Sequence, residues 1–181
     1  MLRIYLAGAI RAGYDVDLKW RDEAVKKLKL NYDVFSPTAG KSWTTEGWKL
    51  LGEEPSGKQI VKQDFWMVDN CDIVLSNLTA LGEGYPCIGT LIELGRATAN
   101  EALIYAVVPK GFQHPFVEEN AAKIFNTVEQ AVEYLVKYVY ILNGMAPENG
   151  MTEINERMQS DLRLVGELEN DDLKIGGTDA D

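Results

Sequence analysis

The chain has 181 residues, of which 46% are hydrophobic. This is enough for one domain with a buried core and too little for two domains with linkers. The net charge is -10, and residues 143–181, with ten acidic and three basic side chains, supply -7 of it. No basic face is visible, which argues against a nucleic-acid-binding protein. A single nucleotide remains a possible ligand, because one helix N-terminus and one arginine suffice to hold it.

The two cysteines, Cys71 and Cys87, have neither CxxC spacing nor a neighbouring histidine. They indicate neither a zinc site nor a disulfide framework, and they favour a reducing compartment. The N-terminal RIYLAGAI lacks the apolar length and the cleavage site of a signal peptide, and no later run is long enough to span a bilayer. We therefore expect a soluble, cytoplasmic protein with a small-molecule ligand.

Apolar runs alternate with helical patterns along the chain. RIYLAGAI predicts a first strand, and residues 32–35 predict a second. Between them, Asp17 is the predicted N-cap of a helix. The later pattern predicts a helix over about 58–69, the strand CDIVLSNL, the helix TLIELGRATAN, the strands ALIYAVV and KIF, and a helix with a capping box at 127–130. This order predicts an α/β three-layer sandwich, flavodoxin-like or Rossmann-like, around a five-stranded parallel sheet.

Two segments do not fit the alternation. Residues 38–57 are polar and carry Trp43 and Trp48, and we expect a long structureless excursion or lid there, because such loops are usually functional. Residues 143–181 are acidic and predict an extension that is partly helical or flexible. The predicted organisation is one domain over 1–142 and an appendage over 143–181.

Several polar residues are expected at the carboxyl ends of the strands, where ligands bind in such folds. They are Tyr5, the loop from Gly8 to Gly13, Asp64 on the helix before the third strand, and Glu93 in the first turn of the helix after it. A capping box with Thr90 at the N-cap explains Glu93 without chemistry. The alternative is a nucleophile, which the helix N-terminus would keep ionised.

The stretches IYLAGAI, QDFWMVDNCDIVL and GTLIELGRA together resemble the nucleoside 2-deoxyribosyltransferase superfamily, which includes the 2′-deoxynucleoside 5′-phosphate N-hydrolases. The resemblance covers most of the first 138 residues. It implies that Glu93 attacks the anomeric carbon of the sugar, that Tyr5 orients Glu93, and that Asp64 handles the proton on the departing base. A carboxylate can trap the oxocarbenium charge of this reaction, which requires no metal or redox cofactor. If Asp64 is not the residue that handles this proton, Asp69 is the alternative. Without a catalytic role, Tyr5 is an ordinary strand aromatic and Asp64 a solvated helix residue.

The loop GAIRAG is similar to the Gly-Ser-Ile-Arg-Gly-Gly loop of the 5′-phosphate hydrolases, with Ala9 in place of the serine. In those enzymes backbone N–H groups and the arginine hold the phosphate. Cys87 stands where transferases of free nucleosides carry Asp and the phosphate hydrolases carry Ser. An uncharged residue there favours a nucleoside 5′-monophosphate. The resulting binding set is Gly8, Ala9, Ile10, Arg11, Gly13, Cys87, Gly89 and Thr90.

The leading expectation is therefore an enzyme that hydrolyses the N-glycosidic bond of a (2′-deoxy)nucleoside 5′-monophosphate. One alternative is a transferase that passes the sugar to a second base. Another is a non-catalytic nucleotide sensor or scaffold, which Ala9, Cys87 and the acidic tail favour. The resemblance also implies a homodimer or larger homo-oligomer that shares residues between active sites.

Further polar and aromatic residues have no assigned role at this stage. Trp43, Trp48 and Trp66 can stack on a base or simply pack. His114 is the only histidine, and its place before Pro115 gives little support to a Ser-His or Cys-His arrangement. The remaining positions of this kind are Asp72, Asn77 and Glu83.

Overall fold

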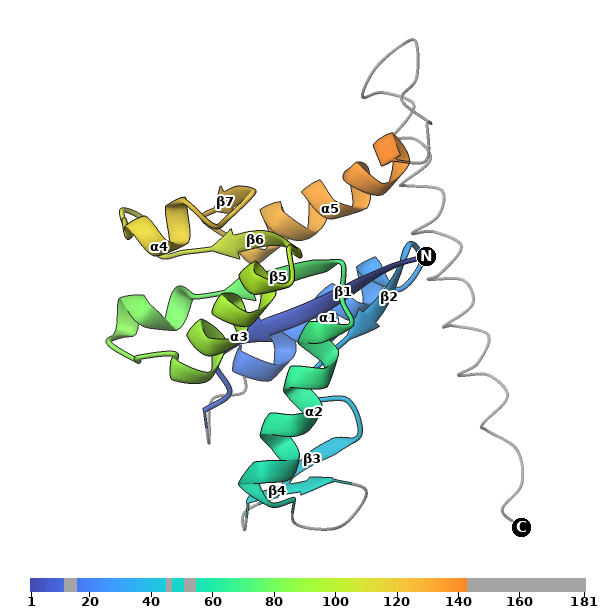
Figure 1. Cartoon of the computed structure of the whole chain (residues 1–181), viewed down its shortest axis with the longest axis vertical. Helices are drawn as coiled ribbons and strands as arrows, with labels where there is room; N and C mark the ends of the chain where they lie inside the picture. The colour runs from blue at the N-terminus through green and yellow to red at the C-terminus, as the bar shows by residue number, and fades with distance from the viewer. Residues whose placement is uncertain (12–15, 45–46, 51–54, 143–181) are drawn as a thin grey trace, which may run out of the picture. The chain divides into compact units, whose positions relative to one another are not determined.

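The computed structural model describes residues 1–11, 16–44, 47–50 and 55–142 (Figure 1). The chain divides into two compact units, Met1–Glu133 and Tyr134–Asp181, and the account below concerns the first. In the described ranges no helix combines the length and apolar character that crossing a bilayer requires. The elements are β1 (Leu2–Gly8), α1 (Val16–Leu28), β2 (Tyr32–Phe35), β3 (Lys41–Thr44), β4 (Gly47–Leu50), α2 (Gly57–Asp69), β5 (Ile73–Asn77), the 3-10 helix η1 (Thr79–Glu83), α3 (Ile88–Ala99), β6 (Leu103–Val107), α4 (Pro115–Glu118), β7 (Lys123–Phe125) and α5 (Val128–Leu142).

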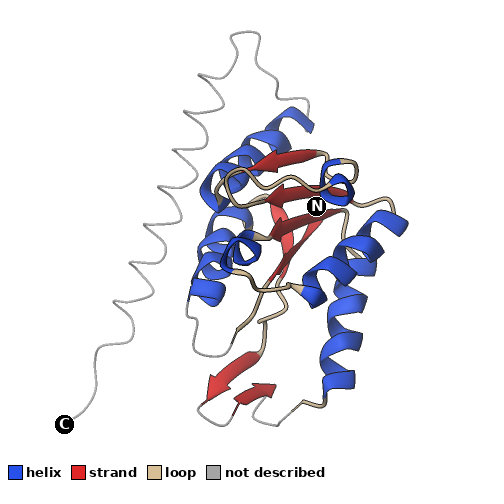
Figure 2. Cartoon of the chain, turned by 90° about the vertical axis from the view of Figure 1, so that its left-hand side faces the viewer, coloured by secondary structure: helices blue, strands red, loops and turns tan. Residues whose placement is uncertain are grey.

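The main sheet has five strands in the order β2-β1-β5-β6-β7, and every pair is parallel. Counted in chain order this is 2-1-3-4-5, which is the order of the flavodoxin-like architecture, one of the two predicted. Helices lie on both faces, with α2 and α3 on one side and α1 on the other (Figures 1 and 2). The predicted three-layer α/β fold is confirmed. The strand order reverses between β1 and β5, so their carboxyl ends open the crevice where ligands bind in this fold.

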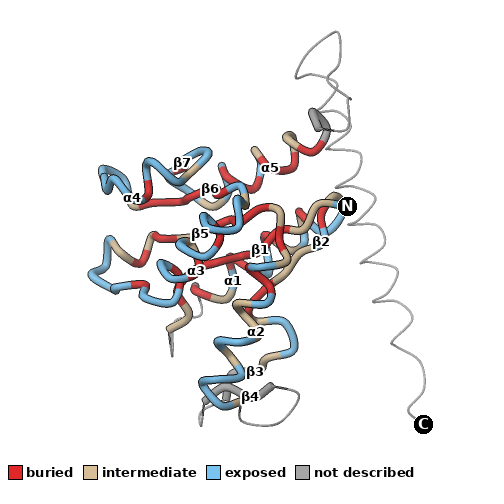
Figure 3. The backbone as a smooth tube through the Cα atoms, in the orientation of Figure 1, coloured by how far each residue is buried: buried red, intermediate tan, exposed pale blue. Residues whose placement is uncertain are grey.

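The central strands are apolar on both faces because both faces are covered (Figure 3). Tyr5 and Ala7 of β1 pack with Val68 of α2 and Ala97 of α3 in one cluster. The alternate β1 side chains, including the fully buried Leu6, face the opposite layer. The α2 and α3 side therefore receives the aromatic ring of Tyr5, and with it a phenolic hydroxyl.

Three local predictions are corrected by the structure. Helix α1 begins at Val16, so Asp17 lies in its first turn and is not the N-cap. The excursion over 38–57 contains an antiparallel hairpin, β3 with β4, where a structureless segment was expected. The short helices η1 and α4 were not predicted, because four or five residues are too few to show a helical period.

Candidate active site

Helix α3 begins earlier than the sequence pattern predicts, and this decides the place of Glu93. Its N-cap is Cys87, in a left-handed conformation with φ 46° and no side-chain capping bond. The capping box built on Thr90 is therefore wrong, and Glu93 lies in the second turn rather than the first. The buried residues of α3 are Thr90, Glu93 and Ala97, a spacing of three and four that defines one inward face. A carboxylate thus occupies a position that helix packing normally fills with an apolar side chain.

Tyr5 and Glu93 meet in the interior. The Tyr5 hydroxyl donates to Oε1 of Glu93 at 2.9 Å, and the two residues are 0% and 8% exposed. Burial raises the pKa of Glu93 to about 7, and the Tyr5 hydrogen bond opposes that rise. The expectation that the helix N-terminus keeps Glu93 fully ionised is corrected here, because burial outweighs it. Burial also raises the pKa of Tyr5, so its hydroxyl keeps its proton and remains a donor.

Asp64 and Lys41 form an ion pair at the edge of the same site. Lys41 Nζ lies 3.2 Å from Oδ1 of Asp64, and the two side chains are 3% and 14% exposed. Burial raises the pKa of Asp64, and Lys41 opposes this rise. The alternative candidate, Asp69, instead binds Arg96 at the far end of α2. Lys41 was missed by the sequence analysis, because no motif marks a single lysine in an irregular polar segment.

A buried guanidinium shapes the loop after β1. The Arg21 side chain is 0% exposed, and burial lowers its pKa to about 10, which leaves it protonated at neutral pH. This charge helps to lower the pKa of Glu93. Its hydrogen bonds fix the backbone that forms the floor of the crevice. The acceptors are the backbone carbonyls of Leu6 (3.3 Å), Gly8 (2.7 Å), Ala9 (3.2 Å) and Asp17.

Arg11 follows in the chain, and two carboxylates hold its side chain. Its Nε and one terminal nitrogen donate to the two oxygens of Asp17, both at 2.8 Å. Its other terminal nitrogen donates to Glu83, and the guanidinium lies 5.5 Å from the centre of the Tyr85 ring. The predicted phosphate-binding arginine is therefore already paired. Asp17 and Glu83 were not recognised as its partners, since 6 and 72 residues separate them from it.

A cavity of about 230 Å³ is lined by eight of the predicted site residues, whereas Tyr5 and Arg11 are not part of its lining. Cys87 is 2% exposed there, and burial raises the pKa of its thiol, which keeps it uncharged. The predicted Gly13 lies outside the described residues. The sequence analysis missed Tyr85, Pro86 and Ile88 on the cavity wall, because no motif marks them in the stretch LGEGYPCIG. The predicted residues that line the cavity are Gly8, Ala9, Ile10, Asp64, Cys87, Gly89, Thr90 and Glu93.

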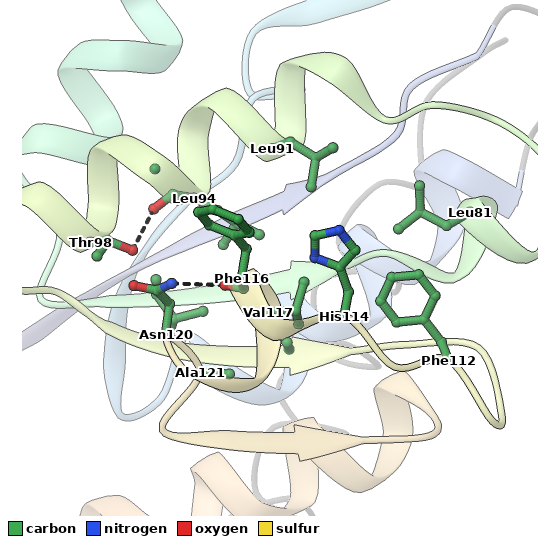
Figure 4. Close-up of a pocket in the computed structure, with 13 residues that line it drawn as sticks. Leu81, Leu91, Leu94, Thr98, Phe112, His114, Phe116, Val117, Asn120 and Ala121 are labelled. Atoms are coloured by element: carbon green, nitrogen blue, oxygen red, sulfur yellow. Dashed lines mark hydrogen bonds between the residues drawn. The ribbon is translucent and has the colours of Figure 1, made fainter.

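A second cavity, of about 470 Å³, shares no lining residue with the first (Figure 4). Its wall is mainly apolar and holds His114, whose ring lies between Phe112 and Phe116 at 6.3 and 5.9 Å. His114 and Glu93 therefore line different cavities. Among the described residues, no group of three or more His, Cys, Asp or Glu side chains is arranged to hold a metal ion.

The other polar and aromatic candidates have local structural partners. Asp72 accepts from the backbone N–H of Arg3, and Asn77 accepts from Thr79. Trp66 is 59% exposed and lies against Phe35. The side chains of Trp43 and Trp48 lie outside the described part of the structure. None of these contacts belongs to the cavity that holds Glu93.

Comparison with known proteins identifies the family. The model of the nucleoside 2-deoxyribosyltransferase family matches residues 4–155. No curated protein matched the chain. A 2-deoxyribosyltransferase from Bacillus psychrosaccharolyticus has a similar structure, with a TM-score of 0.57, 22% identity, and 73% of this chain and 91% of that chain covered.

Two further solved structures share the fold. A CMP N-glycosidase from Clostridium botulinum has a TM-score of 0.50 at 17% identity, covering 74% of this chain and 97% of its own. A 2-deoxyribosyltransferase from Leishmania mexicana has a TM-score of 0.52 at 19% identity, covering 75% and 97%. The family match spans most of the chain, including the strand of Tyr5 and the helices of Asp64 and Glu93. The chain belongs to the nucleoside 2-deoxyribosyltransferase family, whose enzymes cleave or exchange N-glycosidic bonds of small nucleoside substrates.

Proposed function

We propose that the protein cleaves the N-glycosidic bond of a (2′-deoxy)nucleoside 5′-monophosphate through an ester with Glu93. A Glu93 oxygen forms a bond to C1′ as the bond from C1′ to the base nitrogen breaks. The base leaves with the electron pair and a proton, for which Asp64 is the donor. Water then hydrolyses the ester, which returns Glu93 and gives sugar phosphate.

One observation carries this proposal: a buried glutamate whose oxygen accepts from a buried tyrosine beside an open cavity. Packing alone does not favour a carboxylate at this inward position of α3, because burying it costs free energy. With a pKa near 7, about half of Glu93 is ionised at neutral pH. Its remaining oxygen is available to stabilise charge that develops at C1′.

The 5′ end of the substrate is proposed to face the loop from Gly8 to Arg11 and the uncharged Cys87. Both segments line the cavity together with Asp64, which suits a substrate held with its 5′ group against the loop and its base near Asp64. An aspartate at position 87 would repel a phosphate, so Cys87→Asp is expected to raise the KM for monophosphates more than the KM for nucleosides.

The second candidate is base exchange on free nucleosides, and the pairing of Arg11 favours it. Asp17 and Glu83 already neutralise Arg11 and leave the cluster with a net negative charge, which suits an uncharged 5′-hydroxyl. The two candidates share the ester at Glu93. They differ in whether water or a second base accepts the sugar.

The test is incubation of the purified protein with each common ribo- and deoxyribonucleoside and its 5′-monophosphate. Free base is followed by chromatography, with and without a second base. Glu93→Gln is the active-site variant, and Glu23→Gln, on an exposed position of α1, is its matched control. Base released only from monophosphates, and lost only in Glu93→Gln, supports hydrolysis. An exchanged product from nucleosides supports the transferase, and no release leaves the nucleotide sensor.

We also propose that the enzyme works as a homo-oligomer in the cytoplasm, without a metal or redox cofactor. Support for the assembly comes from α3, where Ile88, Leu91 and Ile92 are 64%, 42% and 52% exposed. Ile88 also lines the cavity, so a second copy covering this face would exclude water from the site. Sedimentation of the full chain tests this, and a monomer at working concentration would contradict it.

A further inference from the structure

Arg11 has two carboxylate partners that are held very differently. Asp17 is 8% exposed at its side chain, and it accepts from Nε, from a terminal nitrogen and from the Arg11 backbone N–H. Glu83 is 59% exposed at its side chain and contacts only the other terminal nitrogen. The first contact is bidentate and shielded, which fixes the guanidinium in one orientation. The second is a single exposed ion pair, a kind that contributes little to stability.

The backbone around Glu83 lets its side chain leave at little cost. Glu83 is the last residue of η1, and Gly84 follows it in the left-handed conformation at φ 78°. Nothing lies within 4 Å of the position that a Gly84 Cβ would take, so the turn is open to solvent. A rotation of the Glu83 side chain therefore breaks no contact that the fold requires, and it exposes one guanidinium N–H pair.

The Arg11 side chain, which is 10% exposed, lies next to residues that line the cavity containing Glu93. Arg11 follows Ile10 in the chain and its guanidinium lies over Tyr85, and both Ile10 and Tyr85 line that cavity. Because Arg11 directly follows the Gly8–Ile10 loop, an anionic group bound to that loop is adjacent to the arginine that Glu83 now contacts. The charges of Arg11, Asp17 and Glu83 add to -1 when Glu83 is in place and to zero when it is displaced.

We propose that Glu83 is a displaceable competitor for the anionic group of the substrate, and that it sets how the site discriminates phosphate from hydroxyl. This inference rests on the proposed function, since it names the 5′-phosphate as the group that replaces Glu83. In the empty site the Glu83 carboxylate binds the terminal nitrogen of Arg11 that the phosphate would bind. A phosphate monoester, with a charge near -2 at neutral pH, displaces it and takes the freed N–H pair. An unphosphorylated nucleoside leaves the pair intact.

The experiment compares the full-length wild-type protein with Glu83→Gln. The affinity for inorganic phosphate is measured by calorimetry, and KM is measured for a nucleoside and its 5′-monophosphate. Glu23→Gln removes one exposed carboxylate elsewhere and is the matched control. We expect Glu83→Gln to bind phosphate about five-fold more tightly, the value of one exposed ion pair. The KM for the monophosphate falls by a similar factor, and the KM for the nucleoside stays unchanged.

The role of Arg11 is tested by combining the two changes. In an Arg11→Met background, Glu83→Gln is expected to leave phosphate affinity unaltered, because the guanidinium for which Glu83 and phosphate compete is gone. Equal phosphate affinity in wild type and Glu83→Gln, no phosphate binding to either, or an equal fall in KM for nucleoside and monophosphate overturns the proposal. Phosphate binding needs no turnover, so this outcome is separate from a failure of base release, which would refute the proposed function.

Discussion

The contact between Tyr5 and Glu93 gives the sharpest prediction. Tyr5→Phe keeps the ring in the core and removes only the hydroxyl that donates to Glu93 at 2.9 Å. A hydrogen bond to a charged acceptor is worth about 1.5–3 kcal/mol, and one pKa unit corresponds to about 1.4 kcal/mol. Because this bond favours ionised Glu93, its loss moves the pKa of Glu93 from about 7 up by about one to two units. At pH 7 the ionised fraction, and kcat/KM with it, falls about five- to fifty-fold.

The assay is the pH profile of kcat/KM for base release. The acid limb is expected to move up by about one to two pH units in Tyr5→Phe, while the basic limb, which reports the proton donor Asp64, stays in place. Tyr32→Phe is the matched control, because Tyr32 is equally buried but lies beside Leu2 at the opposite end of the sheet. A uniform loss at every pH, or an acid limb that does not move, would refute the role assigned to Tyr5.

Three further predictions follow from the buried charges. Glu93→Gln is expected to abolish base release and to stabilise the fold. Because the pKa of Glu93 is raised from 4.5 to about 7, the wild type loses stability as pH rises through that window. In urea unfolding the variant should therefore be about 3 kcal/mol more stable than the wild type at pH 8 and equally stable at pH 4. Lys41→Met removes a charge that lowers the pKa of both Asp64 and Glu93, so both limbs of the pH profile should move up, whereas Lys41→Arg should leave them in place. Arg21→Met strips the donor from buried carbonyls and should cost about 3 kcal/mol or more in urea unfolding, and a loss below about 1 kcal/mol would contradict its role.

Much of the fold was predictable because the central strands are continuous apolar runs, which only a doubly covered parallel sheet explains. The start of α3 was not predictable, because a local capping pattern in the sequence competes there with tertiary packing, which the sequence does not show. Thr90 and Glu93 satisfy the local pattern of a capping box, but Thr90 is buried and the helix begins at Ile88, two residues before Thr90. Tertiary packing therefore overrode a local signal.

Side-chain pairing was the other part that sequence could not supply. Most of the residues expected at the strand ends line one cavity, since parallel strands bring their carboxyl ends to one edge. Lys41 and Arg21 carry no motif, and their importance appears only in burial and in the atoms that they contact. Neither residue lies next to Glu93 in the sequence, so no spacing rule connects them to it.

The distance between Tyr5 and Glu93 along the chain has a consequence for how the enzyme is made. The two residues are 88 positions apart, and they meet only after β5 has paired beside β1 and α3 has docked on both. Such long-range parallel pairing forms slowly. Until then Glu93 is an ordinary solvated glutamate, and below neutral pH it must take up a proton as the helix docks. The buried pair of Tyr5 and Glu93 thus exists only in chains that have made these long-range contacts, and partly folded chains lack it.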